Sequence, residues 1–588
     1  TALLMPTYNE SPQRVVAGVQ AIYESLAATG ALAHFDFFVL SDTTDPNVWI
    51  AEESGFLALR ERIGGADHLF YRRRRQNTQR KAGNIAEWVR RFGGAYEQMI
   101  ILDADSLMSG EAIVRLTSAM ERHPDVGLIQ TFPVIVNGTT LFARTQQFAA
   151  RVYGPLIAHG IAWWHGAEGN YWGHNAVIRT RAFAEQAGLP HLAGHKPFGG
   201  YILSHDFVEA ALIRRGGWAV HMVPGLAGSY EESPPSLSDL LVRDRRWCQG
   251  NLQHAAVLPA HGLHWVSRLH LMTGIGCYIT APMWLLFLLI GLLIALQGRF
   301  VPPDYFPAGP TLFPQWPIQD PVRSMWVFVG TMGVLIIPKL FGFVALVADP
   351  ATRRCCGGAA RAFASLLLET IVAGLLAPVT MLVQSAAVIS ILLGRDSDWR
   401  PQRREDGEIR FGEIARRYAG HTGFGLALAG ASYFIAPPLF LWMLPVVLGM
   451  TLAIPLAAAT AKRRSGQLLR RAGLLRTPEE YRPPAVLARA AELRGRLAGE
   501  TVADIRRLLD DPVLLDAHRR MVPQEHRGRH DPPDAVLLVG LAKLDEEETL
   551  DDALARLTMP EKTAVLADQR GIDRLLALAN SSRATRAP

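Results

Sequence analysis

Short apolar runs alternate with amphipathic stretches over the first 260 residues of the chain. Runs with the length and composition of buried strands occupy residues 2–5, 36–41, 68–71, 98–103 and 126–132. Helical periodicity fills the intervals, for example at residues 47–59, 81–92 and 110–122. Strands that alternate with helices favour an α/β domain with a parallel-rich sheet, which we predict for residues 1–260.

The pattern changes after Trp265, where long and nearly uncharged runs replace the short ones. Because about 20 apolar residues cross a bilayer, we predict an α-helical transmembrane bundle at residues 261–461. Its predicted spans lie at residues 269–296, 325–348, 424–440 and 441–461. The last two divide one run that is about twice as long as a single span and carries prolines near its middle.

A further apolar stretch, residues 363–394, is interrupted by Glu369 and Pro378. Arginines at 353, 354 and 361 precede it, and others follow at 395, 400, 403, 404, 410, 416 and 417. Arginine-rich loops stay in the cytosol, so a stretch with such loops on both sides is not expected to cross. We therefore predict an interfacial or re-entrant helix followed by a cytosolic loop at residues 395–423, with a simple crossing as the alternative.

Composition narrows the choice of partners. The formal net charge is only +6 over 588 residues, and the basic residues lie mainly beside apolar runs and in the tail. This suits anionic lipid or a diphosphate better than nucleic acid. The four cysteines have no metal-ligand spacing, so we expect a reducing, cytosolic side and no disulfide framework. Residues 462–588 are charged and helical in pattern, which predicts a cytosolic helical tail.

Two carboxylates, Asp103 and Asp105, end the apolar run at residues 98–103. Ligands of parallel sheets bind beyond the carboxyl ends of the strands. Oxygen ligands in this position suit Mg²⁺ or Mn²⁺ that bridges a diphosphate. Aspartates at strand ends are also common helix caps, so the motif alone leaves both interpretations open.

Polar residues also follow the first two predicted strands. Thr7 and Glu10 come after the first and Asp42 after the second, where they can hydrogen-bond a nucleobase. Lys81 opens a predicted helix, and helix N-terminal amides together with a lysine favour phosphate. Ordinary turn and capping chemistry is the alternative for each of these residues.

Two further motifs precede the first predicted span. Asp206 opens a predicted helix at residues 206–215 and can accept a proton from a hydroxyl, or simply stabilise the helix N-terminus. Arg243, Arg246 and Trp247 can stabilise a leaving diphosphate and stack on a sugar ring. A basic and aromatic belt beside the membrane is the alternative.

The order of these residues resembles the motif series of processive family 2 glycosyltransferases, which include cellulose and hyaluronan synthases. That series is aspartate, Asp-x-Asp, Thr-Glu-Asp and Gln-x-x-Arg-Trp. Here the third motif reads Ser204-His205-Asp206 and the fourth begins with Arg243. These two motif variants, together with the segments at residues 3–10 and 169–175, resemble the motifs of the glucans biosynthesis glucosyltransferase H family. The resemblance covers roughly residues 3–484 and is weak over the last hundred.

The resemblance implies a GT-A-type, Rossmann-like cytosolic domain in a multi-pass protein of the bacterial inner membrane. It implies transfer of glucose from UDP-glucose to a linear β-1,2-glucan, the backbone of osmoregulated periplasmic glucans, with coupled export. Further membrane helices are expected before the catalytic domain and therefore before Thr1. The implied partners are UDP-glucose, the growing glucan, the lipid bilayer, a periplasmic glucan-modifying protein and an acyl carrier protein, with no nucleic acid.

The resemblance also implies roles for individual residues. Asp206 would be the base, and Asp105 with Asp103 would hold the metal ion. Substrate would contact Thr7, Glu10, Asp42, Lys81, Trp172, His174, Arg243, Arg246 and Trp247. Residues 398–404 would form a loop that closes over the donor, and Tyr278, Gln384 and Ser385 would line a path for the glucan. The alternatives are a cellulose-like synthase, a non-processive transferase acting on a lipid carrier, and an inactive membrane regulator or channel.

Overall fold

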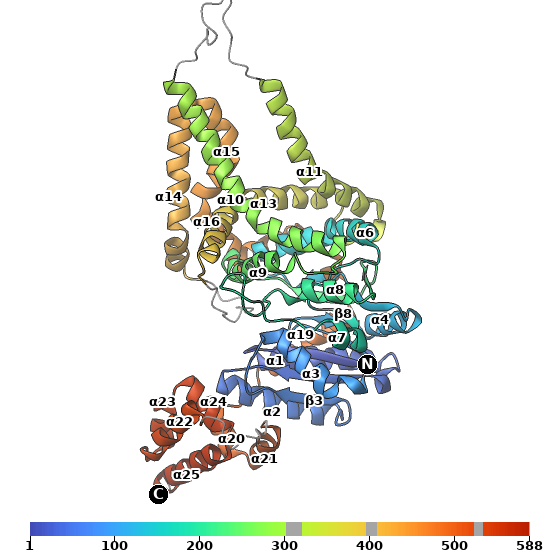
Figure 1. Ribbon diagram of the computed structural model, residues 1–588, viewed down its shortest axis with the longest axis vertical. Coiled ribbons are helices and arrows are strands. Elements are labelled where there is room, and N and C mark those ends of the chain that lie inside the picture. Colours follow the sequence, from blue (N-terminus) through green and yellow to red (C-terminus); the bar gives the residue numbers. More distant parts are fainter. Residues whose placement is uncertain (302–319, 396–408, 523–532, 587–588) are drawn as a thin grey trace, which may run out of the picture.

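A computed structural model describes residues 1–301, 320–395, 409–522 and 533–586 of the chain. An α/β domain lies below a group of long helices, and the C-terminal helices lie at the opposite end of that domain (Figure 1). The predicted donor-closing loop at residues 398–404 lies outside the described residues.

Within the described residues, the α/β domain is built on a seven-stranded sheet with the order β3-β2-β1-β4-β8-β6-β9. The strands are β1 (Ala2–Thr7), β2 (Asp36–Ser41), β3 (Leu69–Arg73), β4 (Gln98–Ile101), β6 (Val126–Thr131), β8 (Ala176–Arg179) and β9 (Ala219–Val223). β1 pairs in parallel with β2 and β4, whereas β8 runs antiparallel to both of its neighbours, β4 and β6. The predicted α/β fold with a parallel-rich sheet is confirmed, and all five predicted strands are present.

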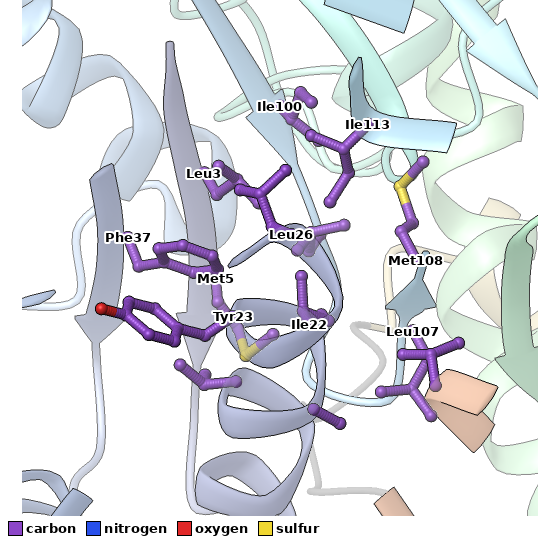
Figure 2. Packing of buried hydrophobic residues seen from close by; sticks show 14 of the residues in the cluster. Leu3, Met5, Ile22, Tyr23, Leu26, Phe37, Ile100, Leu107, Met108 and Ile113 are labelled. Carbon is purple, nitrogen blue, oxygen red and sulfur yellow. The ribbon is translucent and has the colours of Figure 1, made fainter. Parts of the chain in front are cut away.

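Helices cover both faces of this sheet. On one face, α1 (Pro12–Ala27) and α4 (Gly110–Arg122) pack against Leu3 and Met5 of β1 (Figure 2). On the other face, α3 (Arg80–Phe92), α7 (Thr180–Gln186) and α8 (His205–Arg215) pack against Ala2 and Leu4. Successive strand residues point to opposite faces, so a strand covered on both sides is apolar at every position. α1 and α4 come so close that a Cβ at Gly110 would overlap the carbonyl oxygen of Ser25 in α1.

A second, three-stranded sheet borders the first among the described residues. It joins β5 (Leu107–Met108), β10 (Ser229–Glu232) and β7 (Val134–Val136) in the order β5-β10-β7. Three helices complete the domain on the side of the long helices: α5 (Leu141–Val152), α6 (Gly154–His165) and α9 (Leu237–Val257). β10 and α9 thereby bring residues from late in the domain to the edge where β1 and β4 end.

Three of the described helices are long and apolar enough to cross a membrane: α10 (Trp265–Phe300), α11 (Pro321–Ala348) and α13 (Ala359–Leu392). A fourth span would be the pair α15 (Pro437–Thr451) and α16 (Ala453–Ala461), which is bent by 56°. Apolar helices of membrane-spanning length thus lie in the predicted membrane region, which supports a membrane protein. The candidates include α13, which was predicted not to cross, and not the helix that holds most of the predicted span at residues 424–440, so the number of spans stays a prediction.

The boundary predicted inside the last apolar run is wrong by a few residues. α14 (Phe411–Ile435) ends before Pro437, since proline is favoured in the first turn of a helix and starts α15 there. α14 also begins at Phe411, so the last part of the predicted loop at residues 395–423 is helical. The apolar run is thus divided at Ala436. Arg416 and Arg417, which were predicted to lie in the cytosolic loop, lie near the start of α14.

α13 lies between the α/β domain and the other long helices. Its Leu366 packs with Phe148 of α5, and its Ile391 packs with Cys248 of α9. In Figure 1 α13 crosses the view above the α/β domain, whereas α11 and α14 run along the long axis. The helix is continuous through Pro378, so no re-entrant hairpin forms. Its interfacial placement in a bilayer stays a prediction.

The tail is helical, as predicted, but its first part belongs to the α/β domain. After α17 (Arg463–Arg471) and α18 (Pro478–Tyr481), α19 (Ala485–Leu497) packs on α1 and joins the core of the domain. Glu232 of β10 holds this helix, because its carboxylate accepts hydrogen bonds from Arg14 of α1 at 2.6 Å and from Arg494 of α19 at 2.7 Å.

The last helices form a separate bundle. They are α20 (Ile505–Asp510), α21 (Pro512–Met521), α22 (Ala535–Asp545), α23 (Leu550–Arg556), α24 (Met559–Leu566) and α25 (Gln569–Arg586). The bundle packs on α2 (Pro46–Arg62) around Trp49 and Ile50. At the contact, Nδ1 of His518 lies 2.6 Å from the carboxylate of Glu53, and both side chains are fully buried. The C-terminal bundle is therefore docked on the helix that follows β2.

Candidate active site

A cavity of about 810 Å³ opens at the carboxyl ends of β1, β2 and β4. All twelve residues predicted for the site line it: Thr7, Glu10, Asp42, Lys81, Asp103, Asp105, Trp172, His174, Asp206, Arg243, Arg246 and Trp247. They come from strand ends, from the starts of α3 and α8, and from the middle of α9. Segments more than 200 residues apart in the chain thus meet at one edge of the sheet, as expected for a parallel-rich α/β fold.

Asp42 is clamped by an arginine that the sequence analysis did not single out. Arg74 donates from Nε and from a terminal nitrogen to the two carboxylate oxygens of Asp42, each at 2.7 Å, and both side chains are about 5% exposed. The same guanidinium donates to the carbonyls of Thr78 and Arg80. Arg74 is one of four consecutive arginines, so only its pairing distinguishes it. The clamp fixes the turn that leads into α3 and Lys81.

Lys81 joins the Asp-x-Asp motif to the opposite wall of the cavity. Its Nζ donates to the carboxylate of Asp103 and, at 2.6 Å, to the carbonyl of Gly173. The backbone N–H of Asp103 in turn donates to the hydroxyl of Ser106, which holds the turn after β4. A cation from α3 therefore already balances the first aspartate of the motif.

Asp206 lies in the first turn of α8 and faces the cavity. The hydroxyl of Ser204 donates to its Oδ1 at 3.1 Å. Gly173, with φ of +88°, passes so close that a Cβ there would lie 3.3 Å from its Oδ2. The carboxylate is thus oriented by one hydrogen bond and by a residue for which the left-handed backbone favours glycine.

The histidine of the Ser-His-Asp motif is paired below Asp206. Nδ1 of His205 lies 3.1 Å from the carboxylate of Glu209, which is buried one helical turn later. Burial alone would lower the pKa of His205, but the charges of Glu209 and Asp206 raise it above its ordinary value. A protonated His205 places a positive charge beside the candidate base.

A third carboxylate lies near the Asp-x-Asp motif. Glu231 of β10 is 3.3 Å from Nε2 of His174 and lines the cavity. Burial raises the pKa of Glu231, and the charges of Asp105 and Asp103 add to that increase. Nothing in the local sequence distinguishes Glu231 from a surface strand residue, so no motif predicts its place in the site.

The donor set of this region fits a divalent cation. Asp103, Asp105 and Glu231 bring three carboxylates close together in the cavity, and carboxylate oxygens are the hard ligands that such a cation prefers. Among the residues that the structure describes, no three histidine, cysteine or acidic side chains are arranged to hold an ion by themselves. Mg²⁺ commonly binds through one or two protein carboxylates and the phosphates of the substrate, so the two aspartates suffice for that mode.

α9 contributes the third wall of the cavity. The guanidinium of Arg243 lies over the ring of Trp247, 4.4 Å from its centroid, and Trp247 is 49% exposed. A half-exposed aromatic ring beside a cation can stack on a sugar while the cation meets an anion. His191, Lys196 and Tyr201, from the segment between α7 and α8, also line the cavity. No motif in the single sequence marks that segment.

Comparisons with known proteins identify the family to which the chain belongs. The family model described as glycosyl transferase family 2 matches residues 2–186, and glycosyl transferase family group 2 matches residues 99–336. The glucans biosynthesis glucosyltransferase H of Bradyrhizobium diazoefficiens is 55% identical over 583 residues, which cover 99% of this chain and 77% of the relative. The chain belongs to the glucans biosynthesis glucosyltransferase H family. A protein of the same name from Xanthomonas campestris pv. campestris is 59% identical over 501 residues, covering 85% of this chain and 77% of that relative.

Membership of this family confirms the resemblance, the GT-A-like fold and a glycosyltransferase activity in glucan synthesis. Family 2 enzymes generally use a divalent metal, a nucleotide-sugar donor and, here, an acceptor glucan. A crystal structure of S. aureus TarS covers 53% of this chain at 13% identity with a TM-score of 0.29, which is too low to add to the argument.

The polar residues predicted to line an export path have partners inside the protein. Tyr278 and Gln384 hydrogen-bond Asp244, and the hydroxyl of Ser385 donates to the carbonyl of Met381 in its own helix. The alternative, in which such residues satisfy a neighbouring helix, describes these contacts.

Proposed function

We propose that this chain transfers glucose from UDP-glucose to a growing linear β-1,2-glucan by a single inverting displacement. The enzyme would act at the bacterial inner membrane, with its α/β domain in the cytosol, and would add successive sugars before it releases the chain. The convergence of the twelve predicted residues on one cavity carries this proposal, because it gathers donor, acceptor and base groups around one reacting centre.

The donor would lie along the ends of β1, β2 and β4. Thr7, Glu10 and the clamped Asp42 would contact the uracil, and Lys81 would contact the diphosphate. Lys81 can exchange the carboxylate of Asp103 for a phosphate oxygen of the donor, so its positive charge would stay paired when the donor binds. A Mg²⁺ or Mn²⁺ held by Asp105 and Asp103 would supply charge neutralisation of the diphosphate as a leaving group.

The acceptor would enter from the side of α9. Asp206 would take the proton of the attacking hydroxyl, and attack opposite the departing diphosphate would turn an α-linked donor into a β-linked product. Arg243 and Arg246 would stabilise the diphosphate, and Trp247 would stack on the terminal glucose. Trp172 and His174, on the wall next to Asp206, would complete the acceptor site.

The membrane arrangement is proposed from charge and packing. α13 would lie in the cytosolic interface, a placement supported by its contacts with α5 and α9 near its two ends and by the arginines that flank it. The four predicted spans would keep the α/β domain and the tail on the same side. Export of the glucan through this chain, a periplasmic glucan-modifying protein and an acyl carrier protein are implied by the family resemblance alone.

The test is product analysis. The purified protein in lipid nanodiscs is incubated with radiolabelled UDP-glucose and Mg²⁺, and UDP release, product length and linkage are measured. The proposal predicts a β-1,2-linked polymer, with UDP-N-acetylglucosamine as a control donor that gives none. β-1,4 linkage would indicate a cellulose-like synthase, and a single added sugar a lipid-carrier transferase. No UDP release would favour a regulator or channel.

A further inference from the structure

Asp244 of α9 connects the cavity-lining helix to two of the long apolar helices. The hydroxyl of Tyr278 in α10 donates to its Oδ1 at 3.0 Å. The side-chain amide of Gln384 in α13 donates to its Oδ2 at 2.9 Å. One carboxylate therefore holds three helices together, and each of its oxygens is bound from a different one.

The faces of α9 explain why this connection concerns the site. Arg243, Arg246 and Trp247 are spaced three and four residues apart, so they share one face of the helix and line the cavity. Asp244 and Cys248 lie on the adjacent face, where Cys248 packs with Tyr278 and with residues of α13. Rotation of α9 that moved Asp244 would move the three cavity residues with it.

We propose that Asp244 is a positioning residue that fixes the rotation of α9 against α10 and α13 and so sets where Arg243, Arg246 and Trp247 lie in the cavity. The inference rests on the proposed function for the identity of the acceptor. A single carboxylate is well suited to this task, since hydrogen bonds to a charged acceptor are stronger and more directional than neutral ones. The donor-binding residues on β1, β2 and β4 do not depend on Asp244, whereas Arg243 and Arg246, which are proposed to stabilise the diphosphate, do.

This role predicts a specific loss. Misplaced acceptor groups would let the growing glucan leave between additions and would let water compete for the donor. Product length and the fraction of released UDP that appears as polymer would then fall strongly. UDP affinity would fall by no more than about threefold, because Thr7, Asp42 and Lys81 stay in place and only the contacts of Arg243 and Arg246 with the diphosphate shift. A role limited to folding would lower all of these together.

Reversal of hydrogen-bond polarity separates the two roles. Gln384→Glu places a second carboxylate against Asp244, and adding Asp244→Asn restores a donor facing an acceptor. We expect Gln384→Glu to lower polymer formed per UDP released about tenfold or more, and the double variant to recover to within about threefold of wild type. Thr380→Val is the matched control, because its hydroxyl donates to the carbonyl of Leu376 within its own helix, α13.

Each outcome decides the question. Wild-type product length in Gln384→Glu, or no recovery in the double variant, would refute the positioning role. If Gln384→Glu gives no UDP-binding protein, Tyr278→Phe decides instead, since it removes only one hydroxyl: shortened products support the role and unchanged products refute it. Failure of the proposed function is distinguishable, because the wild-type protein itself would then make no polymer.

Discussion

Arg74 is the residue whose loss should affect donor binding most clearly among those that the motifs do not include. The perturbation is Arg74→Met, which keeps an unbranched side chain but removes the guanidinium that clamps Asp42 and the carbonyls of Thr78 and Arg80. The pair is almost fully buried, so the remaining carboxylate of Asp42 would lose its partner without gaining water.

The magnitude follows from that burial. Removal of one partner of a buried ion pair typically costs about 3–5 kcal/mol, because an uncompensated charge is left behind. If about 3 kcal/mol of this cost appears as disorder of the turn before Lys81, the affinity for UDP falls by up to about 150-fold, at about 1.4 kcal/mol per tenfold. Asp42→Asn keeps an acceptor for one hydrogen bond of Arg74, so we expect a loss of about tenfold.

Isothermal titration of UDP into the purified protein, with thermal unfolding in parallel, measures both consequences. Arg75→Met is the matched control: it removes a neighbouring arginine of the same run, whose ion pair with Asp534 is partly exposed and should contribute little. Affinity of Arg74→Met within about twofold of wild type would show that the clamp does not shape the donor site.

Four further predictions concern the chemistry, the metal, the membrane and the tail. Asp206→Asn keeps the shape of the side chain but should lower polymer synthesis by about 10²–10⁴-fold with UDP affinity nearly intact, and near-normal turnover would exclude Asp206 as the base. Activity should vanish in excess chelator and in Asp105→Ala, since two carboxylates cannot offset a diphosphate without a cation; synthesis that persists in chelator would remove the metal from the reaction. If α13 is interfacial, cysteines placed at Arg354 and Arg395 in a cysteine-free background should both resist an impermeant thiol reagent in sealed right-side-out vesicles, and labelling of only one of them means that α13 crosses. Burial would raise the pKa of Glu232, but Arg494 and Arg14 lower it to about 2. The stabilisation of about 3 kcal/mol is therefore present above pH 4.5 and lost as the pH falls toward 2. Glu232→Gln should abolish that acid-dependent step in unfolding, and an unchanged pH profile would contradict it.

The sequence alone determined the elements and the residue types of the site. Strand and helix periods are local properties, so the apolar runs at β1, β2 and β4 and the long helices could be read without knowing what covers them. Their polar ends mark the candidate site: Thr7, Asp42 and Asp103 could be expected at one cavity because parallel strands end at a common edge. Lys81 and Asp206 open predicted helices, and the family resemblance implied their place in the same site.

Only the tertiary structure decided which charges pair and which faces meet. Arg74 is indistinguishable from its three neighbouring arginines until the chain brings it to Asp42, 32 residues away. Asp244 gains its role from Gln384, 140 residues later, and α19 enters the core of a domain that begins more than 480 residues before it. Hydrophobic periodicity is a property of each segment by itself, so it can be read from the local sequence. Ion pairs and hydrogen bonds between distant segments depend on how the segments pack against each other, and the local sequence does not determine that packing.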